Sequence, residues 1–232
     1  LIDTRSDRAC LRLHEPVPRE IVMTTDQPWE GSMCTYITVF RDGDIYRMYY
    51  TGWEVDLERS VGNEEGMVNP HPMWACMAVS DDGLHWEKPE LGLVEHAGSK
   101  ATNIVWQGVG EKVCGVHGFT PFKDPNPDAD PRFCYKAVGG EARAVKGDLY
   151  AMGSPDGVHW SLLLQQPIMR QGIHGKFDSQ NLAFWDAARG EYRIYVRDVR
   201  KTEDGRKFRD IRTATSPDFL HWTETEWLSY PG

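Results

Sequence analysis

One carboxylate in the sequence stands beside two amide side chains. Asp178 comes shortly before Gln180 and Asn181, within the segment 177–186 that reads FDSQNLAFWD. A carboxylate can act as an acid, a base or a nucleophile, and amide groups hydrogen-bond to hydroxyl groups such as those of sugars. A structural Asp in a turn before the next strand is the alternative. We take Asp178 as the first candidate for chemistry.

A second candidate carboxylate directly follows a tryptophan, in Pro28-Trp29-Glu30. An aromatic face beside a carboxylate is the pairing expected in a sugar subsite, because sugar rings stack on aromatic rings. A surface turn after Pro28 is the alternative interpretation. Asp178 and Glu30 are therefore the candidate acidic pair.

Further side chains could line the same site. Trp53 and Glu54 follow an aromatic strand, and Arg197 ends a comparable strand near the C-terminus. An arginine can clamp a carboxylate or a hydroxyl, although the pair Arg197-Asp198 also fits a structural ion pair. The predicted substrate contacts are Trp29, Trp53, Glu54, His117, Gln180, Asn181 and Arg197.

These candidates are distributed over a sequence that repeats itself. The heptamer Ser-x-Asp-x-x-His-Trp occurs at residues 80–86, 154–160 and 216–222. Three matches of this length indicate a common supersecondary unit. Its Asp can accept hydrogen bonds from the following backbone amides, and Gly83 and Gly157 suit a positive φ. Because the Trp then folds over the hairpin, we expect structural roles for the heptamers.

Each heptamer follows three expected strands and precedes a weaker fourth one. Alternating aromatic and β-branched residues with Gly, Asp and Pro turns predict antiparallel hairpins. The expected first strands are 36–42 and 181–186, the second 46–50, 133–137 and 192–196, and the third 75–79, 148–152 and 212–215. We therefore expect an all-β protein, a β-propeller of four-stranded antiparallel blades with about three blades in this chain. The units run over about residues 29–98, 99–170 and 171–232.

The repeat also singles out Asp178. When the acidic turns that end the first strands are aligned, Asp178 falls at the position of Cys34 and Val116. Two units thus have an apolar group where the third has a carboxylate, so the architecture of a blade does not explain this residue.

Two long loops are expected on one face of the propeller, where ligands bind. They run over residues 53–72 and 123–131. The second contains Asp124–Asp130 (DPNPDAD), which lacks the glycine and terminal glutamate of an EF-hand. We expect a rigid surface loop, no metal site and no cofactor, with a structural calcium ion as the alternative.

Composition and charge exclude several classes of protein. The 232 residues carry a net charge of −9, which disfavours binding to nucleic acid or to an anionic membrane. The 22 Gly and 14 Pro argue against a helical bundle. No apolar run is long enough for a transmembrane helix. The chain begins at Leu1 without a Met, and a secreted or periplasmic location is slightly favoured over a cytoplasmic one.

The cysteines form an odd set of 5 without a C-x-x-C pair, which argues against a zinc site or a disulfide scaffold. Four of them lie in or beside apolar runs, so we expect buried thiols, with a disulfide among some of them as the alternative. The five are Cys10, Cys34, Cys76, Cys114 and Cys134.

The order of acidic turn, aromatic strand and S-x-D-G-x-x-W hairpin resembles five-bladed β-propeller glycosidases of the glycoside hydrolase family 32 and 43 types. It resembles in particular bacterial proteins with a family-32-like N-terminal domain. In those proteins a P-W-E segment opens the first blade and F-D-S-Q-N-x-A-F-W-D a later one, here residues 28–30 and 177–186. The likeness covers about Trp29 to Trp227, whereas the W-x-N-D-P-N-G, R-D-P and E-C motifs of β-fructosidases are absent.

This resemblance implies a glycoside hydrolase whose carboxylate pair, Asp178 and Glu30, sits at the channel ends of the innermost strands and acts on a carbohydrate substrate. It also implies a five-bladed ring, so that three units would be an incomplete propeller. A non-catalytic glycan-binding propeller and a protein-interaction propeller are the alternatives.

Overall fold

The computed structural model describes residues 12–61, 68–110, 113–140 and 147–229, which form three four-stranded antiparallel sheets. Blade 1 contains β1 (Met33–Asp42), β2 (Ile45–Trp53), β3 (Trp74–Ser80) and β4 (Ile104–Trp106). Blade 2 contains β5 (His117–Lys123), β6 (Tyr135–Gly140), β7 (Leu149–Ser154) and β8 (Ser161–Leu162). Blade 3 contains β9 (Leu182–Asp186), β10 (Glu191–Lys201), β11 (Lys207–Ser216) and β12 (Glu226–Trp227).

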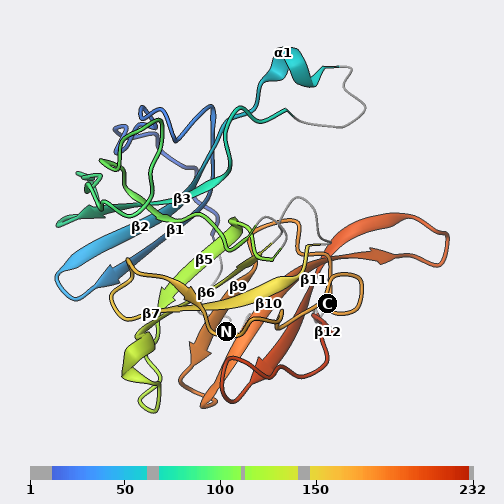
Figure 1. The fold of residues 1–232 in the computed structure, drawn as a ribbon. Coiled ribbons are helices and arrows are strands. Elements are labelled where there is room, and N and C mark those ends of the chain that lie inside the picture. The colour runs from blue at the N-terminus through green and yellow to red at the C-terminus, as the bar shows by residue number, and fades with distance from the viewer. Residues whose placement is uncertain (1–11, 62–67, 111–112, 141–146, 230–232) are drawn as a thin grey trace.

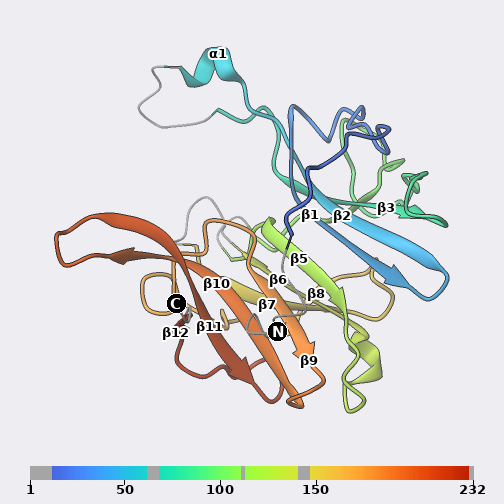
Figure 2. The same ribbon diagram turned by 180° about the vertical axis from the view of Figure 1, so that it is seen from behind.

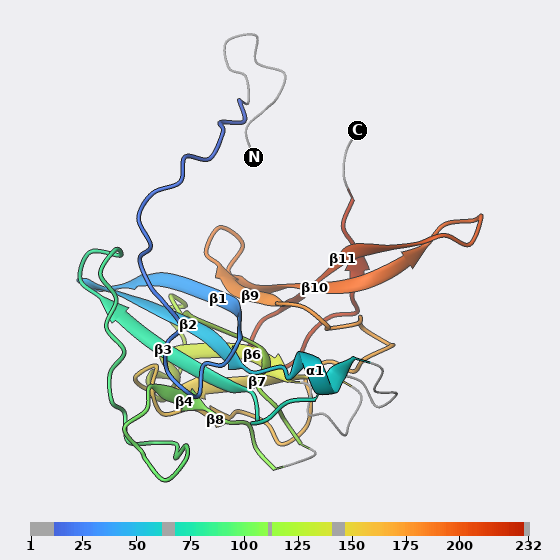
Figure 3. The same cartoon turned by 90° about the horizontal axis from the view of Figure 1, so that it is seen from above.

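The three sheets form an arc of a β-propeller, as predicted (Figures 1 and 2). The first strand of each sheet is its inner strand, since β1 lies against β5 and β5 against β9. Figure 3 shows the arc from above. We call the end of the blades at which β1, β5 and β9 begin the upper end, because it is uppermost in Figure 1.

The heptamers form the same turn in all three blades. Asp82 accepts hydrogen bonds from the backbone amides of Leu84 and His85, both at 2.8 Å, and its other oxygen contacts the His85 ring at 2.7 Å. The Trp86 indole donates back to the Gly83 carbonyl at 3.2 Å. The glycines have the expected positive φ, 79° at Gly83 and 78° at Gly157. The prediction of a structural heptamer is confirmed.

Neighbouring blades pack face to face through apolar side chains. On blade 1 these include Tyr49 and Met77, which meet Val116 and Met152 of blade 2 in one core. A second core joins blade 2 to blade 3. We call the side of a blade that faces the following blade its trailing face and the opposite side its leading face. The leading face of blade 1 is covered by Met23 and Trp29.

Several details differ from the predictions. The loop between β2 and β3, which carries the helix α1 (Leu57–Ser60), leaves the upper end, whereas the loop with η1 (Pro131–Phe133) leaves the lower end. The prediction that both loops lie on one face is therefore wrong, because they follow strands of opposite direction. The first sheet also extends to β4, past the expected boundary at residue 98.

Burial separates the cysteines into two groups. Cys76 and Cys114 are buried free thiols, while Cys34 and Cys134 are half-buried and also free. Cys10 lies outside the described residues. Burial raises the pKa of the Cys114 thiol to about 12, as expected for a cysteine that serves as a small apolar group. Among the described residues, no helix is long and apolar enough to cross a membrane.

Candidate functional site

The predicted site residues come from all three blades and share the upper end. Trp29 and Glu30 precede β1, and Trp53 and Glu54 stand at the end of β2, which pairs with the start of β1. His117 begins β5. The segment from Asp178 to Asn181 leads into β9, and Arg197 lies on β10 beyond its last pairing with β9.

Asp178 is accessible and lies beside a cation. Its side chain is 58 % exposed, and its carboxylate lies 3.5 Å from the Arg197 guanidinium. Arg197 is itself held by the Lys176 carbonyl at 3.3 Å, and its Nε atom has no hydrogen-bond partner among the described residues. An ion pair of this kind orients a carboxylate.

The two amides after Asp178 have different roles. Asn181 is buried, donates to the Phe177 and Ser179 carbonyls at 3.0 and 3.1 Å, and accepts from the Arg197 backbone amide at 3.3 Å. It therefore fixes the shape of the chain around Asp178. Gln180 is exposed and donates to the Thr38 hydroxyl at 2.8 Å, which links blade 3 to the inner strand of blade 1.

Beside this link, irregular backbone brings a tyrosine and a histidine together. Tyr36 has φ of 54°, an uncommon value for a residue other than glycine, at a bulge in β1. Gly118 has φ of 65° at the equivalent bulge in β5. The Tyr36 hydroxyl lies 2.8 Å from His117 Nε2. Strained backbone of this kind concentrates at functional sites.

Glu30, the other predicted acid, is completely buried. Its Oε1 accepts from the Tyr50 hydroxyl at 2.5 Å, and its Oε2 accepts from Lys88 Nζ at 2.8 Å and from the Gln27 backbone amide at 2.9 Å. A carboxylate with no exposed surface and three protein partners cannot reach a substrate in this conformation. It makes no contact with Asp178 in the described part of the chain.

Trp29 belongs to the same polar network. Its indole donates to the Asn103 side chain at 2.7 Å, and Asn103 in turn donates to the Tyr50 hydroxyl at 2.7 Å. The Trp29 ring is half-buried on the leading face of blade 1. Asn103 and Lys88 were not among the predicted site residues, because they lie 74 and 58 positions from their partners and neither belongs to a motif.

The backbone of this lead-in segment, residues 21–32, lies tightly against the end of β2. The Trp53 amide donates to the Glu30 carbonyl at 2.9 Å. A Cβ atom added at Gly52 would lie 2.7 Å from the Trp29 carbonyl oxygen. A side chain at Gly52 would therefore push the lead-in segment off the blade.

Trp53 and Glu54 lie beside a cluster of rings that the sequence did not reveal. His71 Nε2 is 3.7 Å from the Glu54 carboxylate, and the His71 ring stacks on Trp74 with centroids 6.4 Å apart. The His96 ring meets His71 edge-on at 5.4 Å. The indole nitrogens of Trp53 and Trp74 have no partner in the described ranges.

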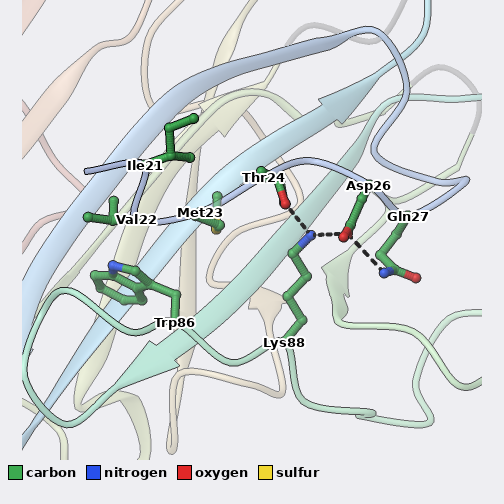
Figure 4. A pocket seen from close by; sticks show the side chains of 8 residues that line it. All are labelled: Ile21, Val22, Met23, Thr24, Asp26, Gln27, Trp86 and Lys88. Atoms are coloured by element: carbon green, nitrogen blue, oxygen red, sulfur yellow. Dashed lines mark hydrogen bonds and ion pairs between the residues drawn. The ribbon is translucent and has the colours of Figure 1, made fainter. Parts of the chain in front are cut away.

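The hollow in Figure 4 lies along the lead-in segment, and Asp178 is not among the residues that line it. Its volume is about 370 Å³. Lys88 is one of the lining residues, and its ammonium group donates to the Thr24 carbonyl at 2.7 Å and to the Asp26 carboxylate at 2.9 Å. The lining residues are Ile21, Val22, Met23, Thr24, Asp26, Gln27, Trp86 and Lys88.

The acidic loop after β5 uses its carboxylates for protein contacts. Asp124 binds Lys136 and accepts from the Tyr192 hydroxyl at 2.7 Å, while Asp130 pairs with Arg132 at 2.7 Å. No group of three potential metal ligands occurs in the ranges that the structure describes.

The sequence matches no protein-family model and no curated protein. Several solved structures nevertheless share the fold. A glycoside hydrolase superposes with a TM-score of 0.57 at 16% identity, over 86% of this chain and 56% of that one. The protein BT0996, solved in an RGII complex, gives 0.55 at 16% identity over the same shares, 86% and 56%.

The Bombyx mori GH32 β-fructofuranosidase BmSUC1 gives a TM-score of 0.50 at 14% identity, over 85% of this chain and 37% of that one. This chain thus spans about half the length, or less, of these structures. At such identities the likeness shows the fold, which is that of propeller glycosidases.

Proposed function

We propose that this chain belongs to a carbohydrate-active β-propeller, a glycoside hydrolase, whose sugar-binding site lies at the upper end of the inner strands. The observation that carries the proposal is the exposed Asp178 carboxylate, 3.5 Å from Arg197, where blades 1 and 3 meet through Gln180. The shared fold with glycoside hydrolases supports this choice of chemistry.

The groups around Asp178 suit a sugar. Arg197 and Gln180 can donate to hydroxyl groups, and the pair formed by Tyr36 and His117 offers a further polar edge on the neighbouring inner strands. Trp53 and Glu54 extend the site along the upper end of blade 1. We assign Asp178 the role of the carboxylate that meets the scissile bond.

Glu30 would be the second acid of the predicted pair only if the lead-in segment moved and exposed it. In the observed conformation we assign Glu30 and Asn181 the role of holding the chain on either side of the site. The burial of Glu30 favours a second candidate function, that of a glycan-binding propeller without hydrolysis.

The test compares the chain with its Asp178→Asn variant on a panel of aryl glycosides and polysaccharides, with sugar binding followed by tryptophan fluorescence. We expect the substitution to lower turnover by at least about 10³-fold while binding persists. Asp204→Asn, at the exposed tip of the β10–β11 hairpin, is the matched control. An unchanged rate in Asp178→Asn contradicts the assignment, and binding without turnover in the parent supports the glycan-binding function.

A further inference from the structure

The second and third strands of blade 3 continue past the inner strand of their sheet. At the upper end, β9 pairs with β10 only as far as Tyr195, whereas β10 and β11 stay paired up to Lys201 and Lys207. The segments 196–201 and 207–212 thus form a two-stranded arm that projects from the blade (Figures 1 and 3). Arg197 stands at its base, and the guanidinium lies 3.5 Å from the Asp178 carboxylate. The arm therefore extends outward from the proposed sugar site.

The arm differs in charge from the rest of the molecule. Residues 197–212 include seven basic and four acidic side chains, a net charge of +3, whereas the whole chain carries −9. A protein with a negative net charge repels polyanions. The arm is thus a local exception, where a negatively charged ligand is attracted.

One side of the arm, which we call the paired side, balances its own charges. Asp198 and Asp210 lie directly opposite each other. The Arg200 guanidinium binds the Asp210 carboxylate at 2.8 Å, and that of Arg212 lies 3.6 Å from Asp198. Both guanidinium groups lie over the Trp227 ring, 4.5 and 4.9 Å from its centroid, within the range of a cation–π interaction. The paired side is therefore neutral and fixed against the protein.

The opposite side, which we call the basic side, has cations and no carboxylate, because successive side chains of a strand point to opposite sides. Lys201 and Lys207 are exposed and directly opposite each other. In the described part of the chain, no acidic side chain pairs with either lysine or with Arg209. Like charges at opposed positions are destabilising, and here nothing in the protein offsets their repulsion. The basic side consists of Arg197, Val199, Lys201, Lys207, Arg209 and Ile211.

The cations of the basic side are regularly spaced. Residues on one side of a strand recur about every 7 Å. Arg197, Arg209 and the lysine pair therefore form a row that leads away from Asp178 in steps of about this length. Guanidinium groups bind carboxylates through two parallel hydrogen bonds, and ammonium groups attract them as point charges. Such a row suits an extended chain that carries carboxylates at intervals.

We propose that the basic side of the arm binds a carboxylated polysaccharide, a chain that contains uronic acid units, and leads it to Asp178. This choice of ligand rests on the proposed function, because the sugar site at Asp178 is what favours a polysaccharide over other polyanions. Arg209, Lys201 and Lys207 bind the carboxylates of the units beyond the one at Asp178.

The probe is polygalacturonate, with a neutral arabinan of similar length as the comparison and binding measured by isothermal titration calorimetry. We expect polygalacturonate to bind, and its affinity to fall by at least about 10-fold between about 0.05 M and about 0.5 M NaCl, because salt screens exposed charges. Absence of binding at the lower salt concentration, or equally tight binding of arabinan, would overturn the proposal.

Two double variants test where the polysaccharide binds. Lys207→Gln with Arg209→Gln should lower the affinity for polygalacturonate by at least about 5-fold, since each exposed ion pair contributes up to about 1 kcal/mol. The matched control is Lys100→Gln with Arg189→Gln, which removes one exposed lysine and one exposed arginine outside the arm. The unfolding temperature of the arm variant should not fall, because the substitution relieves the repulsion between Lys201 and Lys207. Equal affinities in the two double variants would overturn the proposal.

Polyglutamate and Asp178→Asn complete the test. Polyglutamate that binds as tightly as polygalacturonate would overturn the choice of a polysaccharide in favour of an acidic polypeptide. Asp178→Asn should keep its affinity for polygalacturonate, so the two proposals can fail separately. Full turnover of glycosides by Asp178→Asn contradicts the catalytic assignment and leaves the arm as a binding site. Loss of turnover in Asp178→Asn together with unchanged binding in the arm variant overturns the role of the arm alone.

Discussion

Blade 1 and blade 3 each carry a carboxylate just before the inner strand, and the two lie in opposite environments. Glu30 is completely buried and bound by Tyr50 and Lys88. The Asp178 side chain is 58 % exposed and faces Arg197 across 3.5 Å. Two carboxylates that each precede an inner strand can therefore have different roles, and their surroundings decide which one is available for chemistry.

The largest expected effect is the loss of stability on removing the buried carboxylate. Glu30→Ala leaves the Lys88 ammonium, whose side chain is only 17% exposed, without its buried partner. We expect a loss of about 3 kcal/mol in the free energy of unfolding, measured by urea denaturation with tryptophan fluorescence. Asp178→Ala should cost less than about 0.5 kcal/mol. Equal losses of unfolding free energy in the two variants would show that Glu30 does not stabilise the fold more than the exposed Asp178 does.

Removing the hydroxyl of Tyr50 should have a smaller effect. Tyr50→Phe leaves a Glu30 oxygen and the Asn103 amide each short of a hydrogen bond. We expect a loss of about 1–2 kcal/mol in urea denaturation, while Tyr195→Phe on the exposed face of blade 3 changes stability by less than about 0.5 kcal/mol. An unchanged free energy of unfolding in Tyr50→Phe would mean that this network does not hold the lead-in segment on blade 1.

The smallest effect concerns pH. The hydrogen bond from Lys88 lowers the pKa of the exposed Asp26, the outermost carboxylate of the network. A carboxyl group whose pKa is lower in the folded state stabilises the fold above the unfolded pKa of about 3.9, and this contribution is lost as the pH falls toward the folded value. Asp26→Asn should therefore lower the urea midpoint more at pH 6 than at pH 2. A constant difference between the variants at both pH values would contradict this.

The sequence predicted those parts of the fold that depend on residues close together in the chain. The heptamer turn depends on Asp82 and on amides two and three residues away, so the structural role of the heptamer could be inferred from its seven residues. The inner strands of blades 1 and 3 followed from their residue pattern, and the singular position of Asp178 followed from aligning the units. Such features need no knowledge of distant partners.

The burial of Glu30 could not be predicted in this way. Its environment depends on Lys88, 58 residues later, and on a network that closes through Asn103. A Trp next to a carboxylate looks the same in the sequence whether it lines a sugar site or a core. The strain at Tyr36 was equally hidden, because a tyrosine in a strand pattern carries no sign of a positive φ.

The bond between Trp29 and Asn103 also has a consequence for the order of events on the ribosome. The lead-in segment leaves the exit tunnel 74 residues before Asn103 does. At a synthesis rate of about 5–20 residues per second, Asn103 follows the lead-in segment out of the tunnel after roughly 4–15 s. During that interval the Trp29 indole lacks the side chain to which it donates in the folded protein. Chaperone binding to ribosome-bound intermediates should therefore peak before Asn103 emerges and fall once it has folded into place.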